Sequence, residues 1–272
     1  MFSDTPLPPE EPTGQNPPDG AILDYYLARD ASVVVLEIVD DRGGAVRRYS
    51  SRDEPEHVDP PALPYPMYWL RPPQVLSAGR GHHRFVWDLR YAPPRGARRE
   101  LSAAVFRNTA TSPVGPFVHP GRYTVRLTTD GAAVERRLDV RIDPRVGASD
   151  ADLRLQTELS LACYRAYQQA QETREAIDAA MDGPTDVAPA RREQLVALRG
   201  SGTPENPDLL YDSISAADPN QETVVGLQQK LLFMLNLLQS ADARPTAQAA
   251  DAVKRLTAMV PLLNARWARL RQ

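Results

Sequence analysis

The residues that most often carry catalysis or hold metal ions are few in this sequence and stand apart from one another. The chain has four histidines: His57, His82, His83 and His119. They form no HExxH motif and no helical pair. His82 and His83 enter an expected strand as neighbours, so they would point to opposite faces and not bind one metal ion. Cys163 lies in an expected helix with no base near it in sequence, which is typical of a buried apolar group. We therefore expect no catalytic residue, metal site or cofactor.

Motifs of the common enzyme classes are absent from the sequence as well, namely GxSxG, GxxxxGK[ST] and GxGxxG. A glycoside hydrolase would need two carboxylates about 5 to 9.5 Å apart on facing strands. Acidic residues do lie in or beside expected strands: Asp24, Glu37, Asp88 and Asp143. Nothing in the sequence distinguishes them from acids that pair with arginines on the same sheet face. A self-sufficient hydrolase is thus the least favoured interpretation.

Three aromatic residues in a Pro-rich loop are candidates for contact with a ligand or partner: Tyr65, Tyr68 and Trp69. Flat aromatic rings stack on sugars and anchor protein interfaces. The same rings could instead close the open end of a hydrophobic core as a lid, which is the favoured interpretation. Either role predicts that the loop over residues 51–78 is ordered, because three aromatics need somewhere to pack.

Charge is unevenly distributed along the chain. Residues 1–60 hold 13 acidic and 5 basic residues, whereas residues 61–148 hold 6 acidic and 14 basic residues. The two segments most simply complement each other within one domain. The alternative is an anion-binding face around four arginines: Arg95, Arg98, Arg99 and Arg107. The overall pI of 5.9, without a basic stripe interleaved with aromatics, argues against a nucleic-acid partner.

The first half of the chain predicts an antiparallel β domain. Residues 1–19 are rich in proline and indicate an extended tether. Strands are expected at 21–28, 32–39, 45–49, 84–91, 122–128 and 134–142. No helical period lies between these strands, which favours an Ig-like β-sandwich over residues 20–147 with 84–91 as a central strand. Trp87 and Tyr123 are expected to be structural, Tyr123 as the corner tyrosine of such folds.

The second half, residues 149–272, predicts a helical bundle, so the fold class is α+β with segregated parts. Ser149 and Asp152 form a capping-box pattern for a helix that reaches about residue 182. A short helix is expected at 191–199, and another is expected to start at Asp218 and Pro219. Two apolar seams then run through Val224, Leu227, Leu231, Met234 and Leu238 and through Val253, Leu256, Val260, Leu263, Trp267 and Leu270. Core packing is the favoured use of these seams, and a groove for a partner helix is the alternative.

The sequence also bears on the membrane and on export. No window approaches the roughly 18 uninterrupted apolar residues of a membrane-spanning helix. The first twenty residues hold prolines and acids where a signal peptide has a basic end and an apolar run. We therefore expect neither a membrane span nor an export signal in this chain, and the compartment stays undetermined.

Seven segments of the sequence occur in the same order as in a known protein family. They are FSDTP at 2–6, NPPDGAILDYYL at 16–27, VLEIVD at 35–40, GHHRFVWDLRY at 81–91, GP at 115–116, PGRYTVRL at 120–127 and DPR at 143–145. Together they are similar to the C-terminal region of bacterial sortilin-like, sialidase-type-repeat β-propeller proteins, often labelled glycosyl hydrolases. The match covers residues 2 to about 180. His82 and His83 depart from the family pattern, which usually reads Gly-x-Asn-Arg there.

The resemblance implies that an Ig-like module and a helical tail follow a large propeller, in proteins that are generally exported to the periplasm or secreted. We therefore expect a noncatalytic accessory module that docks on, or follows, a β-propeller supplied by the same precursor or a partner chain. Two copies could also pair through the helices. The alternative is a carbohydrate-binding module that uses Tyr65, Tyr68 and Trp69. No catalytic residue of the family is carried onto these positions.

Overall fold

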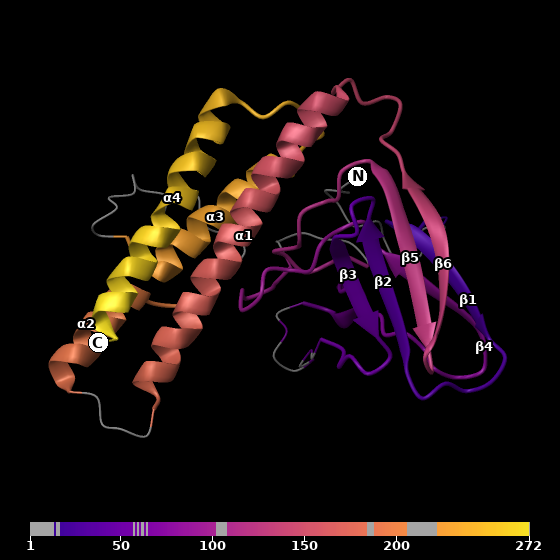
Figure 1. The fold of residues 1–272 in the computed structure, drawn as a ribbon, viewed down its shortest axis with the longest axis horizontal. Coiled ribbons are helices and arrows are strands. Elements are labelled where there is room, and N and C mark those ends of the chain that lie inside the picture. Colours follow the sequence, from indigo (N-terminus) through magenta and orange to yellow (C-terminus); the bar gives the residue numbers. More distant parts are fainter. Residues whose placement is uncertain are drawn as a thin grey trace. The chain divides into compact units, whose positions relative to one another are not determined.

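The structure of the protein is a computed structural model, which describes residues 14, 17–56, 58, 60, 63, 65–101, 108–183, 188–205 and 222–271. The described residues form six strands and four α-helices, an α+β composition (Figure 1). They divide into two compact units. The helical unit takes in residues 93–100 and 112–116, which the sequence analysis grouped with the strands.

The strand unit contains two antiparallel sheets. Its strands are β1 (Ala21–Leu27), β2 (Val34–Asp40), β3 (Ala45–Ser50), β4 (Gly81–Trp87), β5 (Gly121–Thr129) and β6 (Ala132–Val140). One sheet has two strands in the order β1-β4, and the other has four in the order β3-β2-β5-β6. The β5–β6 turn uses Asp130 and Gly131, both with positive φ, as is common for Asp-Gly pairs in hairpin turns.

One hydrophobic core receives side chains from both sheets. Alternate residues of β2, namely Val34, Leu36 and Ile38, are buried, as period-two patterning requires. Phe85 and Trp87 of β4 and Tyr123 and Val125 of β5 join the same cluster. Trp87 is fully buried, and its indole Nε1 donates a hydrogen bond to the Arg90 carbonyl oxygen at 3.0 Å.

The expectation of a central strand at 84–91 was wrong. The strand β4 ends at Trp87, and it pairs with β1 in a sheet of two strands. Leu89, the next alternate position after Phe85 and Trp87, has a φ of 59°. That left-handed conformation breaks the alternation of faces, so the strand cannot run on to residue 91.

The helical unit consists of α1 (Asp150–Met181), α2 (Pro189–Arg199), α3 (Val224–Leu238) and α4 (Ala247–Leu270). Both hydrogen bonds of the predicted capping box form between Ser149 and Asp152. The helices α3 and α4 begin after the caps Thr223 and Thr246. Asp218 and Pro219, the expected start of the third helix, lie outside the described residues.

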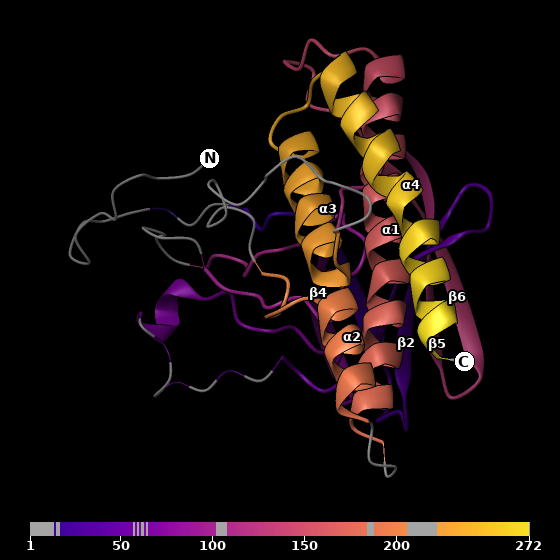
Figure 2. The same ribbon diagram turned by 90° about the vertical axis from the view of Figure 1, so that its left-hand side faces the viewer.

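Helices α1, α3 and α4 run side by side (Figure 2). Both predicted seams pack into one core, where the α3 residues and Val253, Leu256, Val260 and Leu263 are buried. Trp267 and Leu270 pack against that core from its margin. The seams therefore pack inside the unit, as expected, and α4 continues through Pro261.

Two tyrosines of the strand unit, the partly buried Tyr49 and the buried Tyr123, predict base-induced unfolding. Burial raises the pKa of Tyr49 and of Tyr123 to about 12, above the unfolded value of about 10. Folded protein therefore retains these protons longer, so each tyrosine contributes full stability below pH ~10 and loses it as pH rises through ~12. We expect the loss of strand circular dichroism to fall in this window, together with the tyrosinate absorbance of these two residues, measured as the difference between the wild type and the Tyr49→Phe/Tyr123→Phe double variant. Strand loss that is complete below pH ~10 in the wild type, or that has the same pH dependence in the double variant, would contradict this.

Candidate functional site

The aromatic turn, residues 65–69, is the first candidate for a contact site. Pro66 precedes the 3₁₀ helix η2 (Met67–Trp69), whose turn closes with hydrogen bonds from Trp69 N to Pro66 O and from Leu70 N to Met67 O. A tight turn of this kind gives successive side chains different directions. The three aromatics of the turn therefore do not share one environment.

Tyr65 and Trp69 connect the turn to a small hydrophobic cluster. Their rings are stacked, with centroids 6.2 Å apart and planes inclined by 6°. Both are partly buried against Leu70 and Leu101, which form a small cluster separate from the main core of the sheets. This packing supports the aromatic turn; it gives the two rings a supporting role and does not favour a lid over the main core.

Tyr68 projects from the turn, with 58% of its surface exposed. Met67 beside it is 48% exposed and was not singled out from the sequence. A run of alternating aromatic and methionine side chains in a Pro-rich loop could have drawn attention to it. The exposed surface of the turn is thus Met67 and Tyr68.

Backbone hydrogen bonds hold the aromatic turn in place. Arg71 N donates to Thr109 O at 2.8 Å, and Thr109 N donates to Trp69 O at 2.9 Å. The Arg71 guanidinium also pairs with Asp19 at 2.8 Å and donates to Asn108 O at 3.2 Å. Segments far apart in sequence therefore fix the orientation of Met67 and Tyr68.

The two-stranded sheet presents a second exposed surface. Tyr26, 57% exposed, lies against His82 with ring centroids 4.9 Å apart, while Tyr25 lies against His83 on the other face. The two histidines are on opposite faces, as expected. On the exposed face Arg84 donates two hydrogen bonds to Asp24, which lower the pKa of that carboxyl.

Side chains occupy the outer edge of β4. The Gln74 carboxamide accepts a hydrogen bond from Val86 N at 3.0 Å and donates one to Val86 O at 3.3 Å. It thereby substitutes for a neighbouring strand at that position. Edge capping of this type discourages pairing with another chain, so the exposed face of this sheet is a better contact surface than its edge.

The predicted arginine face is largely occupied by carboxylates of the helical unit. Arg95 pairs with Glu175 at 3.3 Å. Arg98 pairs with Glu100 at 2.5 Å and lies 3.8 Å from Glu205. Arg99 is partly buried, and Arg107 lies outside the described residues. These ion pairs offset much of the positive charge that an anion-binding face would need.

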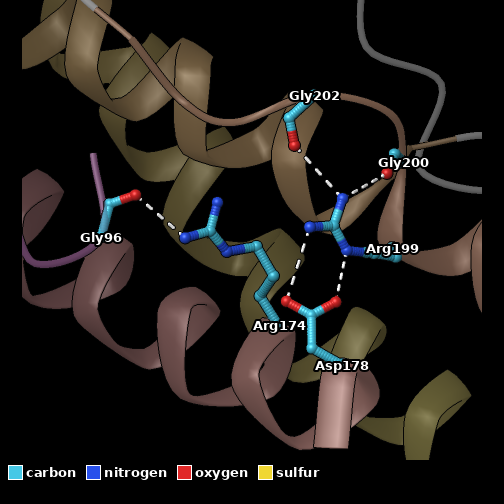
Figure 3. A network of polar contacts seen from close by, with 6 residues as sticks. All are labelled: Gly96, Arg174, Asp178, Arg199, Gly200 and Gly202. Carbon is cyan, nitrogen blue, oxygen red and sulfur yellow. Dashed lines mark hydrogen bonds and ion pairs between the residues drawn. The ribbon is translucent and has the colours of Figure 1, made fainter. Parts of the chain in front are cut away.

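Gly96 anchors the arginine segment on α1 (Figure 3). Its φ is +71°, and its carbonyl oxygen accepts a hydrogen bond of 2.9 Å from Nη2 of Arg174. A Cβ atom at this position would come within 3.0 Å of Gln171 and Arg174 side-chain atoms. Only glycine satisfies both the backbone conformation and this close approach.

Other candidates for chemistry do not assemble into a site. The Cys163 thiol is buried, and burial raises its pKa to about 12, so it is protonated and unreactive at neutral pH. Among the described residues, no group of three or more His, Cys, Asp or Glu side chains is placed to hold a metal ion. Within the same part of the chain, none of the helices has the length and apolar character needed to cross a bilayer.

The sequence was compared with protein-family models and with curated proteins. No protein-family model matches the sequence, and no curated protein matches it significantly.

The close approach at Gly96 yields a stability prediction. We expect Gly96→Ala to destabilise the protein by roughly 2–4 kcal/mol, because it combines strain at positive φ with a collision against α1. Gly202→Ala is the control, since its φ is +76° and nothing lies within 4 Å of the added Cβ. That variant should lose only about 1 kcal/mol. Equal losses of denaturation free energy in the two variants would show that the Gly96 contact with α1 does not form.

Proposed function

We propose that this chain is a noncatalytic interaction module that docks on, or follows, a β-propeller in an exported bacterial protein or assembly. The observation that carries the proposal is the aromatic turn, where an exposed tyrosine and methionine stand on an ordered, packed support. The propeller as partner rests on the resemblance of the segment order described above.

An Ig-like β-sandwich is part of the same proposal. Two antiparallel sheets that share one core support it, as does the pairing of Trp87 with Tyr123, whose rings meet edge to face at 5.8 Å. The Tyr123 hydroxyl donates a hydrogen bond of 2.6 Å to the His119 carbonyl, four residues earlier. A tyrosine bound back to the chain in this way is a feature of Ig-like corners.

The aromatic turn has the properties of a docking anchor. Tyrosine and methionine contribute large contact areas, and tyrosine loses little conformational entropy when it is buried. Because the stacked pair and the backbone bonds to Thr109 already order the turn, docking would pay little of the cost of ordering a loop. A rigid exposed tyrosine is therefore a better anchor than one on a free loop.

The alternative is a carbohydrate-binding module. The nearly parallel planes of Tyr65 and Trp69 favour it, since sugars stack on flat aromatic surfaces. The partial burial of the same two rings against Leu70 and Leu101 opposes it, because a ring packed on a core offers less surface to a sugar. This alternative requires that Trp69→Ala abolish glycan retention without changing the melting temperature.

The docking proposal predicts different outcomes for two tyrosines of equal exposure. A tagged chain would be used to capture partners from native extract, and we expect it to recover a β-propeller protein. Tyr68→Ala should reduce that capture by tenfold or more, the loss of about 1.4 kcal/mol or greater that a hot-spot residue gives. Tyr26→Ala, on the two-stranded sheet, should leave capture unchanged.

Melting temperatures and a glycan array complete the test. Trp69→Ala should melt lower than Tyr68→Ala, because it removes the support of the turn. Capture of a propeller equally by all variants would exclude the aromatic turn as the anchor. Glycan retention that depends on Trp69, with no propeller recovered, would support the carbohydrate-binding alternative instead.

A further inference from the structure

The helical unit contains a buried cation that no carboxylate of the described residues pairs. Arg174 on α1 is only 7% exposed. Its Nη2 donates to the Gly96 carbonyl oxygen, but its Nε and Nη1 have no hydrogen-bond partner in the described part of the chain. Figure 3 shows Nη1 pointing away from Gly96, with no dashed line from the guanidinium to Asp178. Buried charges in proteins are normally paired, so this one needs an explanation.

The neighbouring carboxylates are engaged elsewhere. Both oxygens of Asp178 accept hydrogen bonds from Arg199, at 2.5 and 3.4 Å. Arg199 also donates to the Gly200 and Gly202 carbonyls, which holds it in that pairing. Among the described residues, Arg95 and Arg199 pair with Glu175 and Asp178, and these two carboxylates leave no ion pair for Arg174.

Glu175 is likewise occupied at both oxygens. Its Oε1 accepts a hydrogen bond from Gln171 at 2.9 Å, and its Oε2 pairs with Arg95 at 3.3 Å. Gln171 in turn accepts a hydrogen bond from Gln228 of α3 at 2.9 Å, so the carboxamides form a chain that ends at Glu175. A move of Glu175 toward Arg174 would give up either its ion pair with Arg95 or its hydrogen bond from Gln171.

A second unpartnered donor lies on the same face of α1. Tyr167, two helical turns before Arg174, is buried, and its hydroxyl has no hydrogen-bond partner. Burial raises the pKa of Tyr167, so the hydroxyl keeps its proton at neutral pH. The guanidinium stays protonated as well, because arginine does not lose its proton in this range even when burial lowers its pKa.

We propose that Arg174 binds a small oxyanion, a carboxylate or a phosphate group, through its free Nε–H and Nη1–H donors, with the Tyr167 hydroxyl as a further donor. An oxyanion supplies both things that the site lacks, a negative charge and acceptor oxygens, and arginine matches both groups well. The Gly96 carbonyl fixes the guanidinium from the other side. The anchored Arg199–Asp178 pair keeps the nearest carboxylate from filling the site.

The test is thermal melting of the full chain in chloride buffer with inorganic phosphate or acetate added at constant ionic strength. We expect one of the two anions to raise the melting temperature saturably, by about 5 °C at roughly a hundred times its Kd. The anion with the larger shift identifies the group recognised. Arg174→Gln should lose the shift. Arg165→Gln, the same change at an exposed position of α1, should keep it.

Two results would overturn the proposal. One is the absence of any shift in the wild type, and the other is an equal shift in all three proteins, which would be a general salt effect. A second readout covers the case in which Arg174→Gln fails to fold. In wild-type protein labelled with ¹⁵N at arginine, the Arg174 Nε–H resonance should move on titration with the same anion, and a resonance that stays in place would also refute binding.

Discussion

The helical unit depends on the hydrogen-bond and ion-pair partners that the polar side chains along one face of α1 find on other segments. Gln171, Glu175 and Asp178 each find a partner on a different segment, namely α3, the 93–100 segment and the end of α2. Gln171 is buried, and a buried polar group without a partner costs about 1–3 kcal/mol, a large share of a domain's stability. Its hydrogen bond from α3 therefore matters more than the ion pairs of the more exposed Glu175 and Asp178, and Gly96 permits the 93–100 segment to approach α1 closely.

The strand unit is organised by apolar burial instead. Side chains from two small sheets meet in one core around Trp87, and Tyr123 closes it at the edge. The Pro-rich segment after β3 adds Leu76 to this core and carries the aromatic turn on a small cluster of its own. The division leaves exposed aromatic surface on a rigid loop, which is the arrangement typical of recognition sites on scaffolds.

The proposed docking role and the proposed oxyanion site draw on different features. The first uses Met67 and Tyr68 of the strand unit, where large exposed side chains lie on an ordered turn. The second uses Arg174 of the helical unit, where charge is buried without a counter-ion among the described residues. Neither requires a nucleophile, a metal ion or a redox group from this chain, and its one cysteine is buried. Recognition accounts for both features.

The sequence by itself determined the local elements. Period-two patterning located the strands to within a few residues, and the Ser149–Asp152 box and the apolar seams located α1, α3 and α4, because these signals act between neighbours in the chain. Only the tertiary structure decided the rest. It ended β4 at Trp87, separated Tyr68 from Tyr65 and Trp69, and paired Arg95 and Arg98 with distant glutamates. Arg174 could be recognised only there, since a charge without a partner is a property of its surroundings and not of its position in the sequence.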